Sequence, residues 1–253
     1  MKMKSEILKL LRETDGYVSG QQISGQFGVS RTAVWKVIRQ LQEEGYQVEA
    51  VRNKGYHIVD SPDVMTKEEL SSLINTRWAG RNILYYDVTD STNLRIKQAG
   101  DEGAPHGTLA VADRQTAGRG RRGRTWESPA GSSIYMSILL RPEIAPNKAS
   151  MLTLVMALSV AEGIRQCISQ PGCPELQIKW PNDVIINGKK VVGILTEMSS
   201  QIDYINHVTV GVGINVNMTD FPEEIAQTAT SLRIECGHTV KRAPLIAAVM
   251  ERL

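Results

Sequence analysis

The sequence predicts an α+β protein with two domains. Residues 1–62 have helical periodicity followed by two short alternating segments, whereas residues 63–253 alternate apolar strand-like runs with helical patterns. Between them, Ser61-Pro62-Asp63 has the composition of a linker. A chain of 253 residues is long enough to give each of two such domains its own core.

Three helices are predicted in the first domain. The second begins at Ser19 or Gly20 and ends at Gly28, and the third has Ser30 as its N-cap and ends at Gly45. The third helix carries an apolar stripe at i, i+3, i+4 and i+7, made by Val34, Val37, Ile38 and Leu41. A helix, a turn containing glycine and another helix form the helix-turn-helix pattern.

Polar side chains outside that stripe are able to donate to phosphates and base edges, as a recognition helix in the major groove requires. Alternating segments around Asn53-Lys54-Gly55 predict a hairpin with a basic tip, a wing that would contact the DNA backbone. The expected DNA-binding residues are Gly20, Gln21, Ser30, Arg31, Thr32, Trp35, Lys36 and Arg39.

The charge of this first domain is small. Residues 1–60 hold nine Lys or Arg and seven Asp or Glu, a balance of +2. Phosphate neutralisation drives most DNA affinity, so binding should need a dimer or a ligand-stabilised state. The alternative is a helical interaction module that never touches DNA.

The second domain is predicted to mix strands and helices. Thr66 and the acidic residues after it begin a helix, and Asn187-Gly188 is the strongest hairpin signal in the chain. Strands are expected over 83–88, 108–113, 133–140, 178–186, 189–195 and 208–216, and helices ending near 98 and over 148–168 and 243–253.

The loop from Asp113 to Trp126 carries the clearest chemistry. Glycines there allow positive φ, and Arg119, Arg121, Arg122 and Arg124 supply planar guanidinium groups that bind phosphate in bidentate fashion. The Gly118-x-Gly120-x-x-Gly123 spacing matches the dinucleotide fingerprint, but Thr125 to Pro129 prevents the helix that this fingerprint needs. The loop is therefore expected to close over an anion, the alternative being a solvated basic loop or an RNA-binding segment.

Polar residues that suit a neutral ligand lie before and after the strand expected over 108–113, which leads into this loop. Ser91, Thr92 and Asn93 follow the first expected strand of the domain, over 83–88, and Gln115 lies at the start of the loop. Their donors and acceptors would suit a urea or amide head, although helix capping alone would also explain the first three.

Later in the chain, Asp183 follows a proline and would hold Mg²⁺ beside phosphates or cap a turn. Strand alternation allows only one of Lys189 and Lys190 to face inward, and periodicity does not choose between them. Gly211 and Gly213 remove side chains from the last strand, which fits a ligand or loop packed flat on the sheet, or a bulge.

The combined pattern resembles the biotin protein ligase family. The Gly118–Arg124 loop, Lys179-Trp180-Pro181-Asn182-Asp183 with Lys190, and Gly211-x-Gly213-Ile214-Asn215 follow one another as in that family. With the helix-turn-helix and wing in front, the chain resembles its bifunctional ligases and biotin operon repressors over residues 5–253. The resemblance implies a catalytic domain of the class II synthetase-like (biotin/lipoate ligase) type. Lipoate ligases share this fold, but they lack the arginine-rich loop and the N-terminal DNA-binding domain.

The resemblance also implies an activity, that of a biotin–[acetyl-CoA-carboxylase] ligase. Biotin and MgATP would give biotinyl-5′-AMP, and biotin would pass to a lysine of the biotin carboxyl carrier protein. The adenylate would also be the corepressor that promotes a homodimer on operator DNA. The alternatives are a catalytically impaired biotin-sensing transcription factor and a lipoate or octanoate ligase.

Site residues follow from the same resemblance. The biotin-binding positions are Ser91, Thr92, Asn93, Gln115, Arg119, Gly120, Arg121 and Lys190, which favours Lys190 over Lys189. The catalytic residues are Arg119, Arg121, Lys190 and Asp183, with Asp183 as the Mg²⁺ ligand, and the ATP and adenylate residues are Arg122, Arg124, Trp126, Asn182 and Asn215. Cations are needed because joining a carboxylate to a phosphate brings two anions together.

Composition and length add further expectations. Three cysteines without zinc spacing, no signal peptide and no bilayer-length apolar run favour a cytoplasmic protein without membrane contact. Family members of this type continue into an SH3-like C-terminal domain, which a chain ending at Leu253 is expected to lack. That would weaken ATP binding and carrier docking more than biotin binding.

Overall fold

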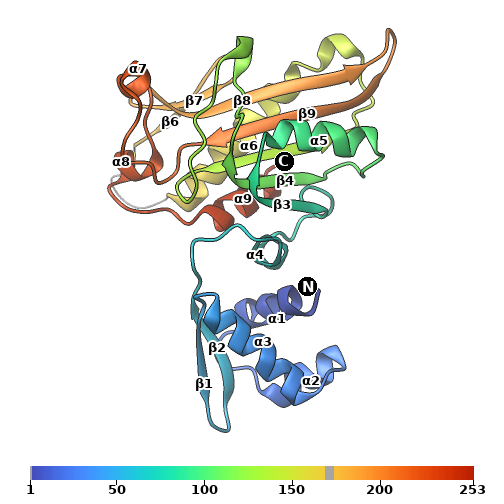
Figure 1. Cartoon of the computed structure of the whole chain (residues 1–253), viewed down its shortest axis with the longest axis vertical. Helices are drawn as coiled ribbons and strands as arrows, with labels where there is room; N and C mark the ends of the chain where they lie inside the picture. The colour runs from blue at the N-terminus through green and yellow to red at the C-terminus, as the bar shows by residue number, and fades with distance from the viewer. Residues whose placement is uncertain (1, 169–173) are drawn as a thin grey trace. The chain divides into compact units, whose positions relative to one another are not determined.

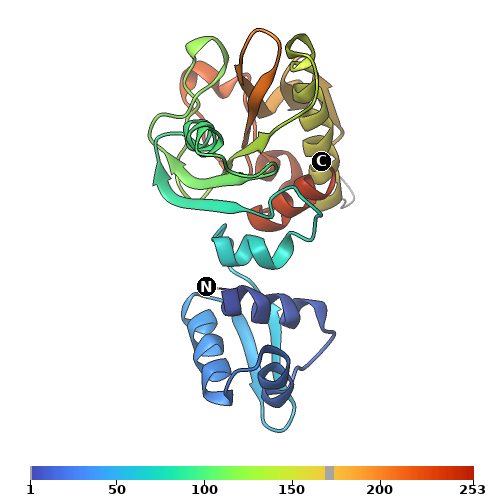
Figure 2. The same cartoon turned by 90° about the vertical axis from the view of Figure 1, so that its right-hand side faces the viewer.

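The computed structural model describes residues 2–168 and 174–253. The chain divides into two compact units, one ending at Leu73 and one covering Ile74–Leu253. Figures 1 and 2 show both units from two directions.

The first unit is a winged helix-turn-helix, as the sequence predicts (Figure 1). Ser19 and Ser30 cap the second and third helices by accepting the N–H groups of Gln22 and Ala33. Gly28 ends the second helix in the left-handed region, with φ 64°. The elements are α1 (Lys2–Glu13), α2 (Gly20–Phe27), α3 (Arg31–Glu43), β1 (Gln47–Val51), β2 (Gly55–Asp60) and α4 (Lys67–Leu73).

Helix α4 packs against α1 within this unit. Glu69 of α4 is 1% exposed, accepts a hydrogen bond from Arg12 at 2.6 Å and accepts another from the Tyr46 hydroxyl at 2.7 Å. A buried carboxylate is tolerated only with such partners. The compact unit therefore extends to Leu73, past residue 62, where the sequence placed the domain boundary.

Within its described residues, 74–168 and 174–253, the second unit is built on a seven-stranded mixed sheet of order β3-β4-β5-β9-β8-β7-β6 (Figure 1). Strands β3 and β4 are parallel, and the other neighbours are antiparallel. Asn187 and Gly188 have φ of 49° and 78° and form the predicted hairpin turn. The strands are β3 (Ile83–Thr89), β4 (Leu109–Gln115), β5 (Ile134–Leu140), β6 (Leu176–Lys179), β7 (Asp183–Ile186), β8 (Lys189–Ser200) and β9 (Ile205–Ile214).

Helices cover both faces of the sheet (Figure 2). Helix α5 lies on the face that carries Gly211, where an added Cβ would come within 2.0 Å of the Asn93 Oδ1. Helix α6 lies on the other face, where the hydroxyls of Thr153 and Thr196 are 2.8 Å apart, and α9 packs beside it. The helices of this unit are α5 (Thr92–Asp101), α6 (Met151–Cys167), α7 (Glu223–Ala226), α8 (Leu232–Cys236) and α9 (Arg242–Glu251).

Several elements differ from the prediction. The helix expected from Lys148 begins at Met151, after a 3-10 turn over Pro146–Lys148. The strand expected over 178–186 is two strands, β6 and β7, which pair antiparallel because the chain reverses in a turn at 180–182 that contains Pro181. Helices α7 and α8 were not predicted. Among the described residues, no helix combines the length and apolar character needed to cross a bilayer.

Candidate active site

Two adjoining cavities lie on the sheet face that α5 covers, and the arginine-glycine loop after β4 lines both. The smaller cavity is formed by the start of α5, the end of β4, the loop and strands β5, β8 and β9. Every residue expected to bind biotin lines it: Ser91, Thr92, Asn93, Gln115, Arg119, Gly120, Arg121 and Lys190.

Polar groups at the start of α5 make tertiary contacts instead of capping the helix. The backbone N–H and the hydroxyl of Thr92 both donate to Oε1 of Gln115, at 2.8 and 3.2 Å. Ser91 occupies the N-cap position, yet its side chain makes no capping bond. Ser91, Thr92 and Asn93 are 2%, 4% and 5% exposed. Capping alone therefore does not explain these residues.

Asn93 is fixed by partners from three strands. Its Nδ2 donates to Oε2 of Glu197 at 2.7 Å, its Oδ1 accepts the Ser137 hydroxyl at 2.6 Å, and its amide lies against the backbone of Gly211. Glu197 also lies 3.8 Å from the Arg119 guanidinium. The sequence did not single out Glu197, because one acidic residue in a strand carries no sign of its partners.

Trp126 packs flat against the sheet. An added Cβ at Gly193 or Gly213 would come within 2.5 Å of the indole, and these two glycines pair directly across β8 and β9. The glycines therefore accommodate a loop side chain, which is one of the readings left open by the sequence, and no bulge interrupts this pairing. Trp126 lines both cavities, and the Lys190 ammonium lies 5.2 Å from the ring centroid.

The arginine-glycine loop makes one tight turn above the cavities. Arg121–Gly123 form a 3-10 turn in which Arg122 has φ 58°. The Arg121 guanidinium donates to Oδ1 of Asn182 at 2.9 Å, which ties the loop to the segment between β6 and β7. The loop thus lines a pocket, while the side chains of its four arginines are exposed.

Lys190 and Asp183 face one another between the cavities. Nζ of Lys190 lies 2.7 Å from Oδ1 of Asp183, an ion pair rather than a well-aligned hydrogen bond. Lys190, and not Lys189, lines both cavities. In the described part of the chain, no group of three or more His, Cys, Asp or Glu residues is arranged to hold a metal.

The larger cavity has a volume of about 500 Å³, a size suited to a nucleotide-sized ligand. Every residue expected to contact ATP or the adenylate lines it: Arg122, Arg124, Trp126, Asn182 and Asn215. Sequence reasoning missed its opposite wall, which the chain around α7 provides with Met218, Phe221, Pro222, Glu224, Ile225, Thr228 and Ala229. An apolar Phe-Pro pair in a loop was the only available signal.

In the first unit, the exposed side of α3 carries the polar residues expected to read DNA. Arg31, Thr32, Lys36 and Arg39 are exposed, and Trp35 is 49% exposed with the Arg39 guanidinium 5.3 Å from its ring. Gly20 and Gln21 begin α2 beside the wing, and they line a surface groove with Arg31 and Lys54.

The two units together define a class of protein, in which a winged helix-turn-helix is joined to a polar pocket beside a larger, cation-lined one. Residues 4–57 match the family model of the HTH domain, and residues 85–215 match that of the biotin/lipoate A/B protein ligase family. The chain belongs to the biotin/lipoate A/B protein ligase family.

Individual relatives agree with this assignment. The chain is 43% identical over 251 residues to the bifunctional ligase/repressor BirA of Bacillus subtilis strain 168, covering 98% of this chain and 76% of that protein. It is 31% identical over 235 residues to BirA of Escherichia coli K12, covering 93% and 70%. The structure of the Aquifex aeolicus biotin protein ligase in complex with biotin and ATP matches with a TM-score of 0.58 and 38% identity, covering 68% of each chain.

Proposed function

We propose that the protein is an ATP-dependent biotin–[acetyl-CoA-carboxylase] ligase and a transcriptional repressor of the biotin operon. It forms biotinyl-5′-AMP and then transfers biotin to a lysine of the biotin carboxyl carrier protein. The observation that carries this proposal is the lining of two adjoining cavities. The whole biotin set lines the smaller cavity, and the whole adenylate set lines the larger one. The residues shared by both cavities are Gly120, Arg121, Trp126, Asn182 and Lys190.

The smaller cavity supplies the donors and acceptors that a ureido ring requires. Gln115 and Thr92 meet at its wall, and Ser91 is 2% exposed beside them. A buried polar ring is bound well only where each of its groups finds a partner. Trp126 covers part of the cavity with an apolar surface that suits an aliphatic chain.

The chemistry takes place where the two cavities adjoin. A carboxylate oxygen of biotin attacks the α-phosphorus of ATP and forms an O–P bond. The bond from the α-phosphorus to the oxygen that bridges to the β-phosphorus breaks, and pyrophosphate leaves. Arg119, Arg121 and Lys190 neutralise the charge that develops, and donors held in place before reaction are more effective than water. Enclosure by the loop keeps water from the mixed anhydride until the carrier lysine attacks its carbonyl carbon and AMP leaves.

Asp183 is suited to help bind Mg²⁺ with the nucleotide. It lines the larger cavity, as Glu127 and Glu224 do, and it is partnered by Lys190. Mg²⁺ is commonly held by one or two carboxylates together with substrate phosphates and water, so a single carboxylate fits. When bound, the ion would neutralise part of the phosphate charge of ATP.

The winged helix-turn-helix unit binds DNA through α3 and the wing. The small charge of residues 1–60, +2, favours a homodimer that places two recognition helices on one palindromic operator. The adenylate would promote this dimer by ordering the arginine-glycine loop. A loop that the ligand has already ordered loses less conformational entropy when the dimer forms, so association costs less free energy. Both activities use cytoplasmic ATP and chromosomal DNA, so we place the protein in the cytoplasm.

A biotin-adenylation assay of this 253-residue chain tests the enzymatic proposal. Labelled biotin, MgATP and a carrier domain should give an adenylate that chases into the carrier, and Arg119→Ala should impair adenylate formation or retention. Adenylate binding without transfer would favour the catalytically impaired sensor. Calorimetry in which lipoate binds and biotin does not would favour a lipoate or octanoate ligase.

A gel-shift assay with operator DNA tests the regulatory proposal. Biotin together with ATP should increase the fraction of DNA bound, and a shift insensitive to both ligands would contradict the corepressor role. Sedimentation in the presence and absence of the ligands tests the dimer.

A further inference from the structure

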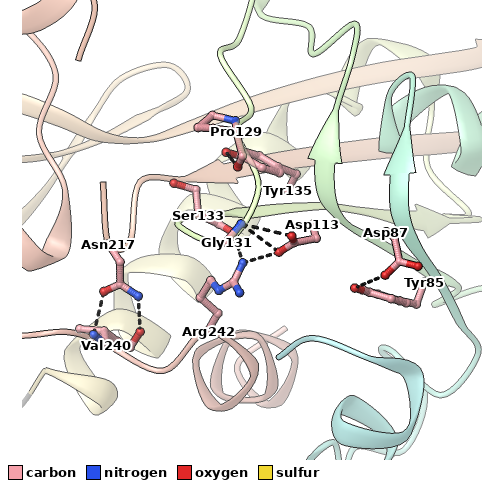
Figure 3. Close-up of polar contacts among 10 residues, drawn as sticks. All are labelled: Tyr85, Asp87, Asp113, Pro129, Gly131, Ser133, Tyr135, Asn217, Val240 and Arg242. Carbon is pink, nitrogen blue, oxygen red and sulfur yellow. Dashed lines mark hydrogen bonds and ion pairs between the residues drawn. The ribbon is translucent and has the colours of Figure 1, made fainter. Parts of the chain in front are cut away.

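The arginine-glycine loop leaves and rejoins the sheet at a point that we call the loop neck: Asp113 on β4, and Gly131 and Ser133 before β5 (Figure 3). Paired residues of β4 and β5 end at Ala112 and Tyr135. Beyond this pair, the two segments are connected at the neck by side chains and further along by a backbone bond from Gln115 to Ser128.

Arg242 of α9 and Asp113 make most of that connection (Figure 3). The Arg242 Nη1 donates to Oδ1 of Asp113 at 2.7 Å and to the carbonyl oxygen of Ser133 at 3.3 Å. The Asp113 carboxylate also accepts the Gly131 N–H, at 3.2 Å to each oxygen. One guanidinium therefore bridges both sides of the neck.

The environment makes this bridge specific. The Arg242 side chain is 4% exposed and that of Asp113 is 26% exposed. A guanidinium buried to this degree requires a charged partner and aligned acceptors. Both bonds leave from one nitrogen, Nη1, so an ammonium at this place would supply the charge and part of the hydrogen bonding, without the rigid planar frame of the guanidinium.

The neck leads directly to residues of the smaller cavity. Gln115 lies two positions after Asp113; its backbone N–H donates to the Ser128 carbonyl at 3.2 Å, and its Oε1 accepts from Thr92. The Tyr135 hydroxyl adds a second tie by donating to the Pro129 carbonyl at 3.0 Å (Figure 3). A shift at the neck would therefore move Gln115 and the base of the loop together.

We propose that Arg242 is a positioning residue for biotin binding, acting through Asp113. Within the described residues, Arg242 lines neither cavity, so it acts without touching a ligand. Its role is to hold the neck at the width at which Gln115 meets Thr92 and the loop arginines face the pocket. The activity readout of this inference rests on the proposed ligase function.

The test compares Arg242→Gln, Arg242→Lys and Asp113→Asn in the full chain. Arg242→Gln should raise the KM for biotin about tenfold with a smaller change in kcat, as expected when one charged hydrogen bond to a binding element is lost. Arg242→Lys should recover part of the effect. Arg252→Gln is the matched control, because it removes the same charge from the end of α9 and contacts Gln166 instead of the neck.

Limited trypsin digestion provides a readout that does not need activity. Cleavage at Arg119 to Arg124, measured well below the unfolding temperature, should be about tenfold faster in Arg242→Gln and in Asp113→Asn. Wild-type KM and cleavage rate in both variants would overturn the proposal, as would a lower Tm with neither changed. Failure of the wild-type chain to form an adenylate would count against the ligase function, and the cleavage comparison would still decide the role of Arg242.

Discussion

The indole ring of Trp126 lies against the backbone of Gly213, with a second glycine, Gly193, on the neighbouring strand. An added Cβ at either glycine would come within 2.5 Å of the ring. The loop that carries the arginines is therefore seated on the sheet through a flat side chain that only glycine accommodates. The position of the loop therefore depends on the presence of glycine at 193 and 213.

Gly213→Ala should displace Trp126 and weaken biotin binding and adenylate yield by about tenfold, the effect of disturbing one packed wall of a pocket. Calorimetric titration with biotin measures the affinity. Gly25→Ala is the control, since nothing lies within 4 Å of its added Cβ. Unchanged affinity in Gly213→Ala would show that the contact has no role in binding.

Lys190→Met should lower the rate of adenylate formation about a hundredfold, because one preorganised cation is removed from the developing charge. Release of pyrophosphate from biotin and MgATP measures this rate. Lys189→Met removes the same charge one position earlier on β8 and should leave the rate near wild type. An equal loss in both variants would mean that net charge matters and not the position of Lys190.

Lys36→Ala in α3 should weaken operator binding by a similar factor for all DNA sequences. It should also reduce the slope of log K for DNA binding against log salt concentration by about one, as loss of one phosphate contact does. Fluorescence anisotropy at several salt concentrations gives the slope. Lys9→Ala is the control, because Lys9 lies on α1 within 3.6 Å of Glu13. An unchanged slope in Lys36→Ala would remove this residue from the DNA interface.

Glu69→Ala should destabilise the first unit by about 3 kcal/mol, because it leaves the Arg12 guanidinium without its buried partner. Urea unfolding followed by the fluorescence of Trp35 measures the free energy of unfolding. Glu68→Ala, at the neighbouring position on the same helix, should change it by less than about 0.5 kcal/mol. Similar values for the two variants would show that the Arg12–Glu69 pair adds little.

The carboxyl of Asp90 should contribute stability in a pH-dependent way. Burial alone would raise the pKa of Asp90, but the Ser91 N–H, the Thr89 hydroxyl and the Arg95 guanidinium together lower it. The contribution is therefore present above the unfolded carboxyl pKa of about 4 and is lost as the pH falls through the lower folded pKa. The Tm difference between wild type and Asp90→Asn should be largest near pH 7 and should shrink at acidic pH; a constant difference would contradict the assignment.

Local signals were sufficient to predict the first unit. The apolar spacing on α3, the serine caps at Ser19 and Ser30 and the left-handed Gly28 all act within a few residues of chain, and the structure confirms each. The same holds for the turn at Asn187-Gly188. The limit of the unit was not predicted, because α4 is joined to it by Glu69 and Arg12, which are far apart in sequence.

In the second unit, residue types and the family resemblance indicated which side chains would form the site. Periodicity left Lys189 and Lys190 equivalent, and it gave no reason to place Trp126 on Gly213. The Lys190 outcome depends on how β7 pairs with β8, where the register shifts between Val184 and Ile185. The Trp126 outcome depends on how β8 and β9 pair and on where the loop returns. Both follow from packing between strands rather than from the spacing along one strand.

The sequence by itself determined the order of elements, the caps and turns, and the chemical character of the arginine-glycine loop, because these depend on neighbouring residues. Only the tertiary structure decided that Glu197 holds Asn93, that the chain around α7 closes the larger cavity, and that Arg242 bridges the loop neck. Each of these joins segments separated by long stretches of chain. A buried polar group finds its partner through the geometry of the fold, and the sequence pattern around it carries no record of that partner.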